Sequence, residues 1–136
     1  MYKRQVLVDT CIWSGALRSK KPENEQLAQE LMSLIDDGRA KIIGVIRQEL
    51  LSGYSDEQRY ENLRKRMNWF PNELVIDDDY EQAAAFSNIC RRKGIQGSHI
   101  DFLICAISVR LGLHIFTIDQ DFEHYIKHIP INLYHL

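Results

Sequence analysis

Short apolar runs alternate along the chain with longer segments whose apolar residues recur at intervals of three and four positions. Short β-branched runs are typical of buried parallel strands, and the longer pattern is typical of amphipathic helices. The strands predicted in this way cover residues 6–8, 40–45, 74–76 and 114–118, and residues 131–136 are a candidate for one more.

The helices predicted between these strands carry start and stop signals at their ends. In chain order they run over residues 22–38, from Ile46 to about Gly53, over 56–70, 77–94 and 98–112, and briefly after Asp119. Three acidic residues open the helix at 77, and cations followed by Gly94 end it, as the helix dipole favours. The alternation predicts a single domain over residues 1–136, with an α/β fold of three α/β/α layers around a mostly parallel sheet.

Composition narrows the class of protein further. A chain of 136 residues with 45% hydrophobic and 26% charged residues is expected to fold as one globular domain. A net charge of −2 gives no global basic field. The three cysteines show no zinc or disulfide spacing, and no apolar stretch approaches the ~20 residues of a membrane span. These features predict a cytoplasmic protein without a membrane segment.

Two carboxylates follow predicted strands directly. Asp9 comes after the first strand and Asp119 after the fourth. In sheets of this class the ligand crevice lies beyond the carboxyl ends of the strands, so neighbouring strands would bring both acids to one crevice. The alternative interpretation of each is an N-cap of the following helix, a role that aspartate serves well.

Two further acids have less obvious settings. Asp101 stands three residues after Ser98, in the S-x-x-[DE] pattern of a capping box, which could be its whole role. Glu49 follows Val45 by four positions and Ile46 by three, a spacing that predicts a place on the apolar stripe of its helix. Because a buried unpaired carboxylate is costly, this position would call for a partner.

Four segments containing these acids, VLVDT, QELLSG, SHIDFLICAIS and FTIDQDF, together resemble the signature regions of PIN-domain ribonucleases. The compact length is similar to that of the VapC-type toxins of bacterial toxin–antitoxin pairs. The resemblance implies that the catalytic and metal-binding acids are Asp9, Glu49, Asp101 and Asp119, with Asp121 a candidate fifth ligand and Thr117 a supporting hydroxyl. Cys11 departs from the Ser or Asn of many relatives, so no polar role near the metal is expected of it.

Converging carboxylates require charge compensation, because each close pair costs ~1 to 4 kcal/mol at 4 Å. Ligation by oxygen alone suits Mg²⁺ or Mn²⁺, which can activate water for phosphodiester hydrolysis. The resemblance selects RNA as substrate and implies a small antitoxin protein as partner and a homodimer. The sequence does not identify the substrate-binding residues. A solvated helix face is the simpler interpretation of each cationic candidate. These candidates are residues 18, 20, 21, 64–66 and 91–93.

Three alternatives remain at this stage. The chain could be a PIN-like nuclease that processes RNA or acts on DNA without a toxin role. It could be a phospho-receiver module, although that class needs paired acids after the first strand and a late lysine that this sequence does not supply. It could also be a non-catalytic interaction domain in which the acids only cap helices.

Overall fold

The computed structural model of the chain describes residues 3–18 and 21–136, apart from the side chain of Arg18. Four short strands form one sheet in the order β3-β2-β1-β4, and every pair of neighbours is parallel. The strands are β1 (Val6–Val8), β2 (Ala40–Ile43), β3 (Asn72–Glu73) and β4 (His114–Phe116). The predicted mostly parallel sheet is therefore confirmed.

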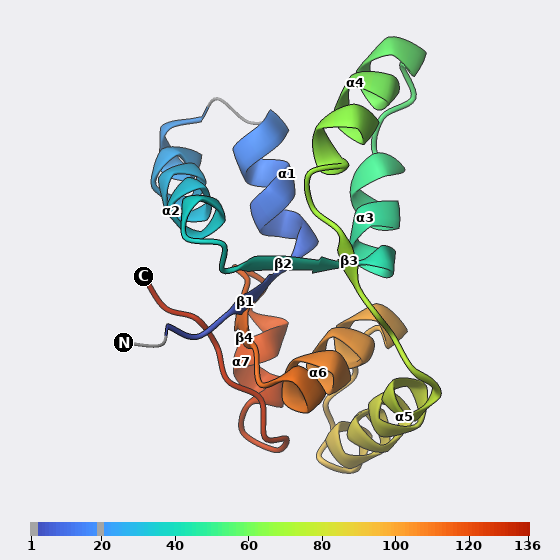
Figure 1. Cartoon of the computed structure of the whole chain (residues 1–136). Coiled ribbons are helices and arrows are strands. Elements are labelled where there is room, and N and C mark those ends of the chain that lie inside the picture. The colour runs from blue at the N-terminus through green and yellow to red at the C-terminus, as the bar shows by residue number, and fades with distance from the viewer. Residues whose placement is uncertain (1–2, 19–20) are drawn as a thin grey trace.

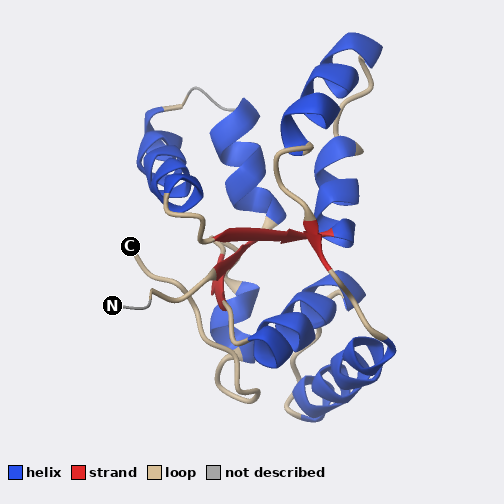
Figure 2. Cartoon of the chain, viewed as in Figure 1, coloured by secondary structure: helices blue, strands red, loops and turns tan. Residues whose placement is uncertain are grey.

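Helices cover both faces of this sheet (Figures 1 and 2). One layer contains α1 (Thr10–Arg18), α2 (Glu25–Asp36), α3 (Gly44–Leu51) and α4 (Glu57–Met67), with a short 3-10 turn at Pro22–Asn24 before α2. The other contains α5 (Asp77–Arg92), α6 (His99–Leu111) and α7 (Asp121–Tyr125). The predicted three-layer α/β/α architecture is confirmed, and none of the helices over the described residues is long and apolar enough to cross a membrane.

The direction of the chain reverses beside β1. The chain first moves outward from β1 to β2 and β3, and then returns through α5 and α6 to place β4 on the other side of β1. In open parallel sheets, ligands bind at such a switch point, outside the carboxyl ends of the strands. The fold therefore points to the ends of β1 and β4 as the place to look for a site.

The core is built on the sheet and on the inner faces of the helices. Val6, Leu7 and Val8 are fully buried, which explains why β1 reads as an unbroken apolar run. Trp13 on α1 is also buried, and its Nε1 donates a hydrogen bond to the carbonyl of Val8 at 3.1 Å. This bond fixes the start of α1 directly against the end of β1.

The third strand lies two residues earlier than the sequence predicts. The predicted run at 74–76 leaves the sheet, and Leu74 and Ile76 are exposed. Side chains satisfy their backbone groups instead: Arg110 Nη2 donates to the Leu74 carbonyl at 2.7 Å, and the Ile76 amide donates to Asp79 Oδ2 at 2.9 Å. A strand prediction from β-propensity alone misses this, because the competing partners come from α5 and α6.

Two other strands end two residues earlier than predicted. The second strand ends at Ile43 because α3 already begins at Gly44, and the fourth ends at Phe116. The predicted last strand at 131–136 is wrong as an element: Leu133 makes one isolated parallel bridge with Ile115. Its neighbours still bond to Ile115, with Asn132 accepting and Tyr134 donating, so this segment covers the outer edge of β4.

An ion pair with a buried carboxylate ties α5 to α6. Asp79 is 2% exposed, and Arg110 donates to it twice, from Nε to Oδ1 at 2.7 Å and from Nη2 to Oδ2 at 2.9 Å. Burial raises the pKa of Asp79, but the bonds from Arg110 and from the Ile76 amide outweigh this effect, so its pKa lies below the ordinary range. The pair therefore favours the charged carboxylate in the folded state.

We predict that Arg110→Met lowers the free energy of unfolding at pH 7 by about 3 kcal/mol, the low end for breaking a buried pair, because Arg110 is 31% exposed. Denaturant melts measure this loss. Since the folded-state pKa of Asp79 is depressed, its contribution is present above the ordinary aspartate pKa and disappears as the pH falls through the folded-state value. The variant should therefore lose less stability than wild type on acidification.

The matched control is Arg92→Met, because Arg92 is exposed near the end of α5. Its unfolding free energy should stay within about 0.5 kcal/mol of wild type. Equal stability of the Arg110 and Arg92 variants would contradict a stabilising role for the buried pair.

Candidate functional site

The candidate site forms where β1 and β4 end side by side. The parallel register pairs Val8 with Phe116, so Asp9 and Thr117 are the next residues on neighbouring strands. The Asp9 amide donates to the Phe116 carbonyl at 2.9 Å, which continues the ladder by one bond. Two residues more than a hundred positions apart in sequence thus lie together, as the parallel arrangement predicts.

Asp9 is buried at the centre of a hydrogen-bond network. It is 8% exposed; its Oδ1 accepts from the Thr10 amide at 2.8 Å, and its Oδ2 accepts from Thr117 Oγ1 at 2.8 Å. Burial raises the pKa of Asp9 and the charge of Glu49 adds to this, although the hydrogen bonds oppose it. The side chain does not make the bond to the second or third helical amide that defines an N-cap, so the capping interpretation fails for Asp9.

Thr117 connects two of the predicted acids. Its hydroxyl donates to Asp9 Oδ2 and accepts from the Asp119 amide at 3.0 Å. One side chain thereby orients the Asp9 carboxylate and fixes the backbone on which Asp119 stands. Asp119 Oδ1 in turn accepts from the Asp121 amide at 2.9 Å. Because Gln120 is the N-cap of α7 and Asp121 its first residue, this bond is a local turn before the helix, and Asp119 is not the predicted N-cap.

Cys11 takes part in the same network, which corrects the expectation of no polar role. Its Sγ lies 3.6 Å from Asp9 Oδ2 and 3.5 Å from Thr117 Oγ1, and it accepts from the Ile118 amide at 3.5 Å. Burial, reinforced by the charge of Asp9, raises the pKa of the Cys11 thiol. The protonated thiol is therefore a weak donor beside the acids, the kind of place where a hydroxyl or amide would also fit.

Asp101 reaches the site from the first turn of α6. The Ser98 hydroxyl accepts from the Asp101 amide at 3.0 Å, which is the cap that the sequence predicts. The carboxylate has a different partner: its Oδ2 accepts from the Tyr125 hydroxyl at 2.7 Å. Burial raises the pKa of Asp101, and the charges of Asp119 and Asp9 raise it further, against the bonds from Tyr125 and Ser98.

Three of the predicted acids form one compact group. Asp101, Asp119 and Asp121 each offer a carboxylate oxygen, and these oxygens all lie within 4.8 Å of one another. Asp9 stands outside this group but acts on it, since its charge helps to raise the pKa of Asp101. The three clustered acids concentrate negative charge and offer only oxygen atoms as ligands.

The position of Glu49 on α3 differs from the predicted one. The apolar stripe of α3 is formed by Ile46 and Leu50, both buried, whereas Glu49 is exposed. The predicted place on the buried stripe is therefore wrong, because three- and four-residue spacing also fits the edge of a helix face. The charge of Glu49 still acts on the site, since it contributes to the raised pKa of Asp9.

Sequence reasoning missed Tyr125, the buried residue that holds Asp101. Its position four residues after Asp121 on a short helix is the only local signal, because residues four apart share a helix face. That signal does not reveal the contact with Asp101, which lies 24 positions away in sequence. Of the cationic candidates, Lys20 and the Arg18 side chain lie outside the described residues, and Arg64 is paired with Glu61.

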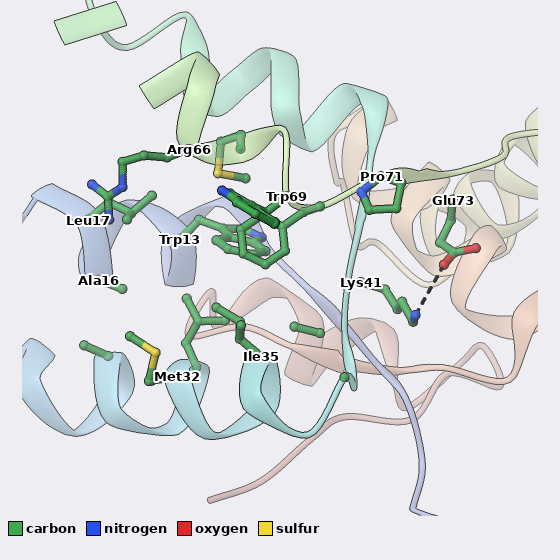
Figure 3. Close-up of a pocket in the computed structure, with 16 residues that line it drawn as sticks. Trp13, Ala16, Leu17, Met32, Ile35, Lys41, Arg66, Trp69, Pro71 and Glu73 are labelled. Atoms are coloured by element: carbon green, nitrogen blue, oxygen red, sulfur yellow. Dashed lines mark ion pairs between the residues drawn. The ribbon is translucent and has the colours of Figure 1, made fainter. Parts of the chain in front are cut away.

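An apolar groove lies in the helical layer of α1, α2 and α4 (Figure 3). It encloses about 760 Å³ between α1, α2 and the segment joining α4 to β3, and its apolar lining includes Trp13, Ala16, Leu17, Met32, Ile35, Trp69 and Phe70. Trp69 is 85% exposed and Met32 is 58% exposed. Arg47 on α3 donates to the carbonyls of two residues that line the groove, Met67 at 2.9 Å and Phe70.

A parallel sheet with helices on both faces and carboxylates at its switch point defines a doubly wound α/β protein with an acidic site. The family model of the PIN domain matches residues 6–127. Because this match covers most of its length, the chain belongs to the PIN-domain family, as the resemblance predicts. No curated protein sequence matches the chain significantly.

Solved structures share the fold at low sequence identity. FitAcB from Neisseria gonorrhoeae aligns with a TM-score of 0.78 at 20% identity, over 96% of this chain and 97% of that chain. VapBC2 from Rickettsia felis, bound to a DNA fragment from their promoter, gives 0.74 at 12% identity over 96% and 98%. DNA-bound VapBC from Salmonella typhimurium gives 0.73 at 16% identity over 97% and 98%. These likenesses confirm the PIN fold.

We predict that Asp101→Asn leaves the protein in EDTA at least as stable as wild type, by up to ~1 kcal/mol. Asparagine can still accept from Tyr125, and the Ser98 cap uses the backbone amide, so the substitution removes charge without removing either bond. The raised folded-state pKa means that wild type gains stability as the pH falls through that value, and the variant should lack this gain. Thermal melts from pH 7 down to the ordinary aspartate pKa measure both effects.

The control is Asp78→Asn, an exposed acid in the first turn of α5. Its removal weakens a favourable helix-dipole interaction, so this variant should be slightly less stable than wild type. An Asp101 variant that loses as much stability in EDTA as the control would contradict repulsion among the clustered acids.

Proposed function

We propose that this chain is a metal-dependent endoribonuclease toxin that hydrolyses RNA phosphodiester bonds and is neutralised by a cognate antitoxin. The observation that carries the proposal is the group formed by Asp101, Asp119 and Asp121 beside the buried Asp9, at the switch point of a PIN-domain sheet. The catalytic acids of the proposal are Asp9, Glu49, Asp101 and Asp119, with Glu49 acting from outside the clustered acids. Membership in the PIN family displaces the phospho-receiver alternative.

The donor set fits a hard divalent cation. Three carboxylate oxygens within 4.8 Å of one another can share one cation, and the group contains neither His nor Cys. Oxygen ligands of this kind favour Mg²⁺ or Mn²⁺ over zinc. Asp101, Asp119 and Asp121 would hold the ion, with Asp9 completing its surroundings.

A divalent cation would supply Lewis-acid activation of water and of the scissile phosphate. The chain's own residues do the rest. Thr117 and the Thr10 amide fix the Asp9 carboxylate, so its charge is held at one place without a reorganisation cost. Without a bound cation, the same acids would repel a phosphodiester backbone. RNA binding at this site would therefore depend on cation binding.

The toxin role rests on family membership and on structural relatives. The FitAcB and VapBC structures share the fold over nearly their full lengths, and VapBC2 was solved with DNA from their promoter. For this chain we propose a small antitoxin partner, a homodimer and a cytoplasmic location. The exposed apolar groove supports the partner: Trp69 and Met32 are large side chains that stand in water in the isolated chain.

We predict that Asp9→Asn and Asp119→Asn each reduce cleavage of a total RNA pool by ~10²-fold or more, because both remove charge from the crevice. Purified protein without antitoxin would be assayed in Mg²⁺, in Mn²⁺ and in EDTA, and wild type should cleave only with metal. Circular dichroism should show the native fold in both variants. At position 9 the Asn oxygen can still accept from the Thr10 amide, and the Asn NH2 group can donate to the Thr117 hydroxyl in place of the bond that Asp9 accepts. At position 119 the Asn oxygen can accept from the Asp121 amide.

Asp36→Asn, an exposed acid at the end of α2, is the matched control and should cleave as wild type does. Binding to the folded state alone predicts that Mn²⁺ at one hundred times Kd stabilises wild type by about 2.7 kcal/mol, an increment the Asp119 variant should largely lose. Undiminished cleavage by either site variant would refute the assignment of that acid.

The groove generates a separate prediction. Trp69→Ser should weaken antitoxin binding by about 2 kcal/mol or more, roughly 30-fold, as expected for an aromatic anchor at an interface, while leaving RNA cleavage unchanged. Isothermal titration with the partner encoded in the same operon measures the affinity. Tyr80→Ser, at an exposed aromatic residue away from the groove, is the control and should bind as wild type does.

A further inference from the structure

Tyr125 is buried in an unusual place for a residue with a polar end. Its side chain has no exposed surface, and its hydroxyl donates to Asp101 Oδ2 at 2.7 Å. Asp101 is one of the three clustered acids, so the bond reaches directly into the candidate metal site. A buried phenol needs a partner, and here that partner is a carboxylate at the site.

The aromatic ring of Tyr125 is fixed on two sides. The Phe102 ring lies 4.9 Å away between centroids at an interplanar angle of 44°, and the Phe122 ring lies 5.2 Å away at 71°. Both phenylalanines are buried, and they belong to α6 and α7 respectively. The hydroxyl therefore has a defined position before any ligand binds.

Gly97 completes the setting of Tyr125. A Cβ at position 97 would lie 2.2 Å from the Tyr125 hydroxyl oxygen, 2.8 Å from Cζ and 2.9 Å from Phe102 Cε2. Gly97 is not among the glycines with a positive φ, so its backbone conformation does not itself require glycine. The glycine therefore leaves room for the Tyr125 hydroxyl, which is nearest, and for the edges of the Tyr125 and Phe102 rings.

Helix α7 contributes to the acid group twice. It begins with Asp121, a member of the group, and ends with Tyr125, which binds another member. A strong hydrogen bond to one oxygen of a carboxylate fixes the direction of the other oxygen. Hydrogen bonds of this kind, from residues that do not touch the metal, orient metal ligands in proteins. Five residues of α7 therefore couple Asp121 to the orientation of Asp101.

We infer that Tyr125, with the space that Gly97 leaves for it, is a positioning residue that orients the Asp101 carboxylate toward a divalent cation shared with Asp119 and Asp121. This inference rests on the proposed function, since it assigns an outer support to the same metal site. Tyr125 does not itself contact the cation in this assignment. It acts through Asp101, by one hydrogen bond.

The test is the affinity for Mn²⁺ alone, measured by electron paramagnetic resonance of free Mn²⁺ on the full chain without antitoxin. Tyr125→Phe removes only the hydroxyl, and the Kd for Mn²⁺ should rise about 10-fold or more. Cleavage at limiting Mn²⁺ should fall with it and recover at saturating Mn²⁺. The matched control is Tyr134→Phe, whose hydroxyl donates to Glu30 on α2, and its Kd should equal that of wild type.

Gly97→Ala gives a second, independent variant. It should also raise the Kd for Mn²⁺, but it should add little in the Tyr125→Phe background, because the bond that it disturbs is already gone. Thermal melts in EDTA show whether each variant is folded. Additive effects of the two substitutions would mean that Gly97 does not act through the hydroxyl, and would overturn that part of the inference.

A folded Tyr125→Phe protein with the wild-type Kd for Mn²⁺ would overturn the inference and leave the proposed function standing. If the Kd rises as expected but neither wild type nor variant cleaves RNA, the positioning role is supported and the ribonuclease proposal fails. Weak Mn²⁺ binding by the Tyr134 control as well would also count against the inference, because the effect would then not be specific to Asp101.

Discussion

The pairing of β1 with β4 is the constraint on which the site depends. Because Val8 is in register with Phe116, the two strands end at the same level, and the chain must place Asp9 and Thr117 next to each other. A slip of one residue would turn every side chain of β4 to the other face of the sheet. The apolar runs that bury both strands therefore also determine which polar residues meet at their ends.

The helices then bring further charge to a place where it is unfavourable without compensation. Asp101 comes from the start of α6, and Asp121 from the start of α7. Each stands in the first turn of its helix, where the dipole favours an acid, and this offsets part of the mutual repulsion. Local helix electrostatics and the requirement of the site thus favour the same residues, which is why capping and ligation are hard to separate by sequence.

Much of the architecture follows from local patterns. The buried run of β1, the Ser98 cap and the Gly112 end of α6 were all predicted, because apolar periodicity and helix-end residues act over a few positions. Asp9, Asp101, Asp119 and Asp121 could be predicted as candidates because they follow strands or open helices. Their grouping needed the parallel topology and the family resemblance as well.

The errors have a common physical origin in contacts between distant segments. The Leu74 carbonyl accepts a hydrogen bond from Arg110 and not from a neighbouring strand, and the apolar run at 74–76 is not a strand. Tyr125 was missed because its partner lies on another helix, and the exposure of Glu49 depends on what packs beside α3. In each case a pattern of a few residues carries no information about the distant segment that packs against them.

Buried carboxylates have two different kinds of hydrogen-bond donors in this structure. At Asp79 the buried carboxylate receives three hydrogen bonds, two of them from a guanidinium, and its pKa falls. At Asp9 and Asp101 the donors are hydroxyls, a thiol and a backbone amide, all neutral, and the pKa of each acid rises. Neutral donors orient a carboxylate without cancelling its charge, so the negative potential of the crevice is retained for a cation. A guanidinium at either position would stabilise the fold and remove that potential.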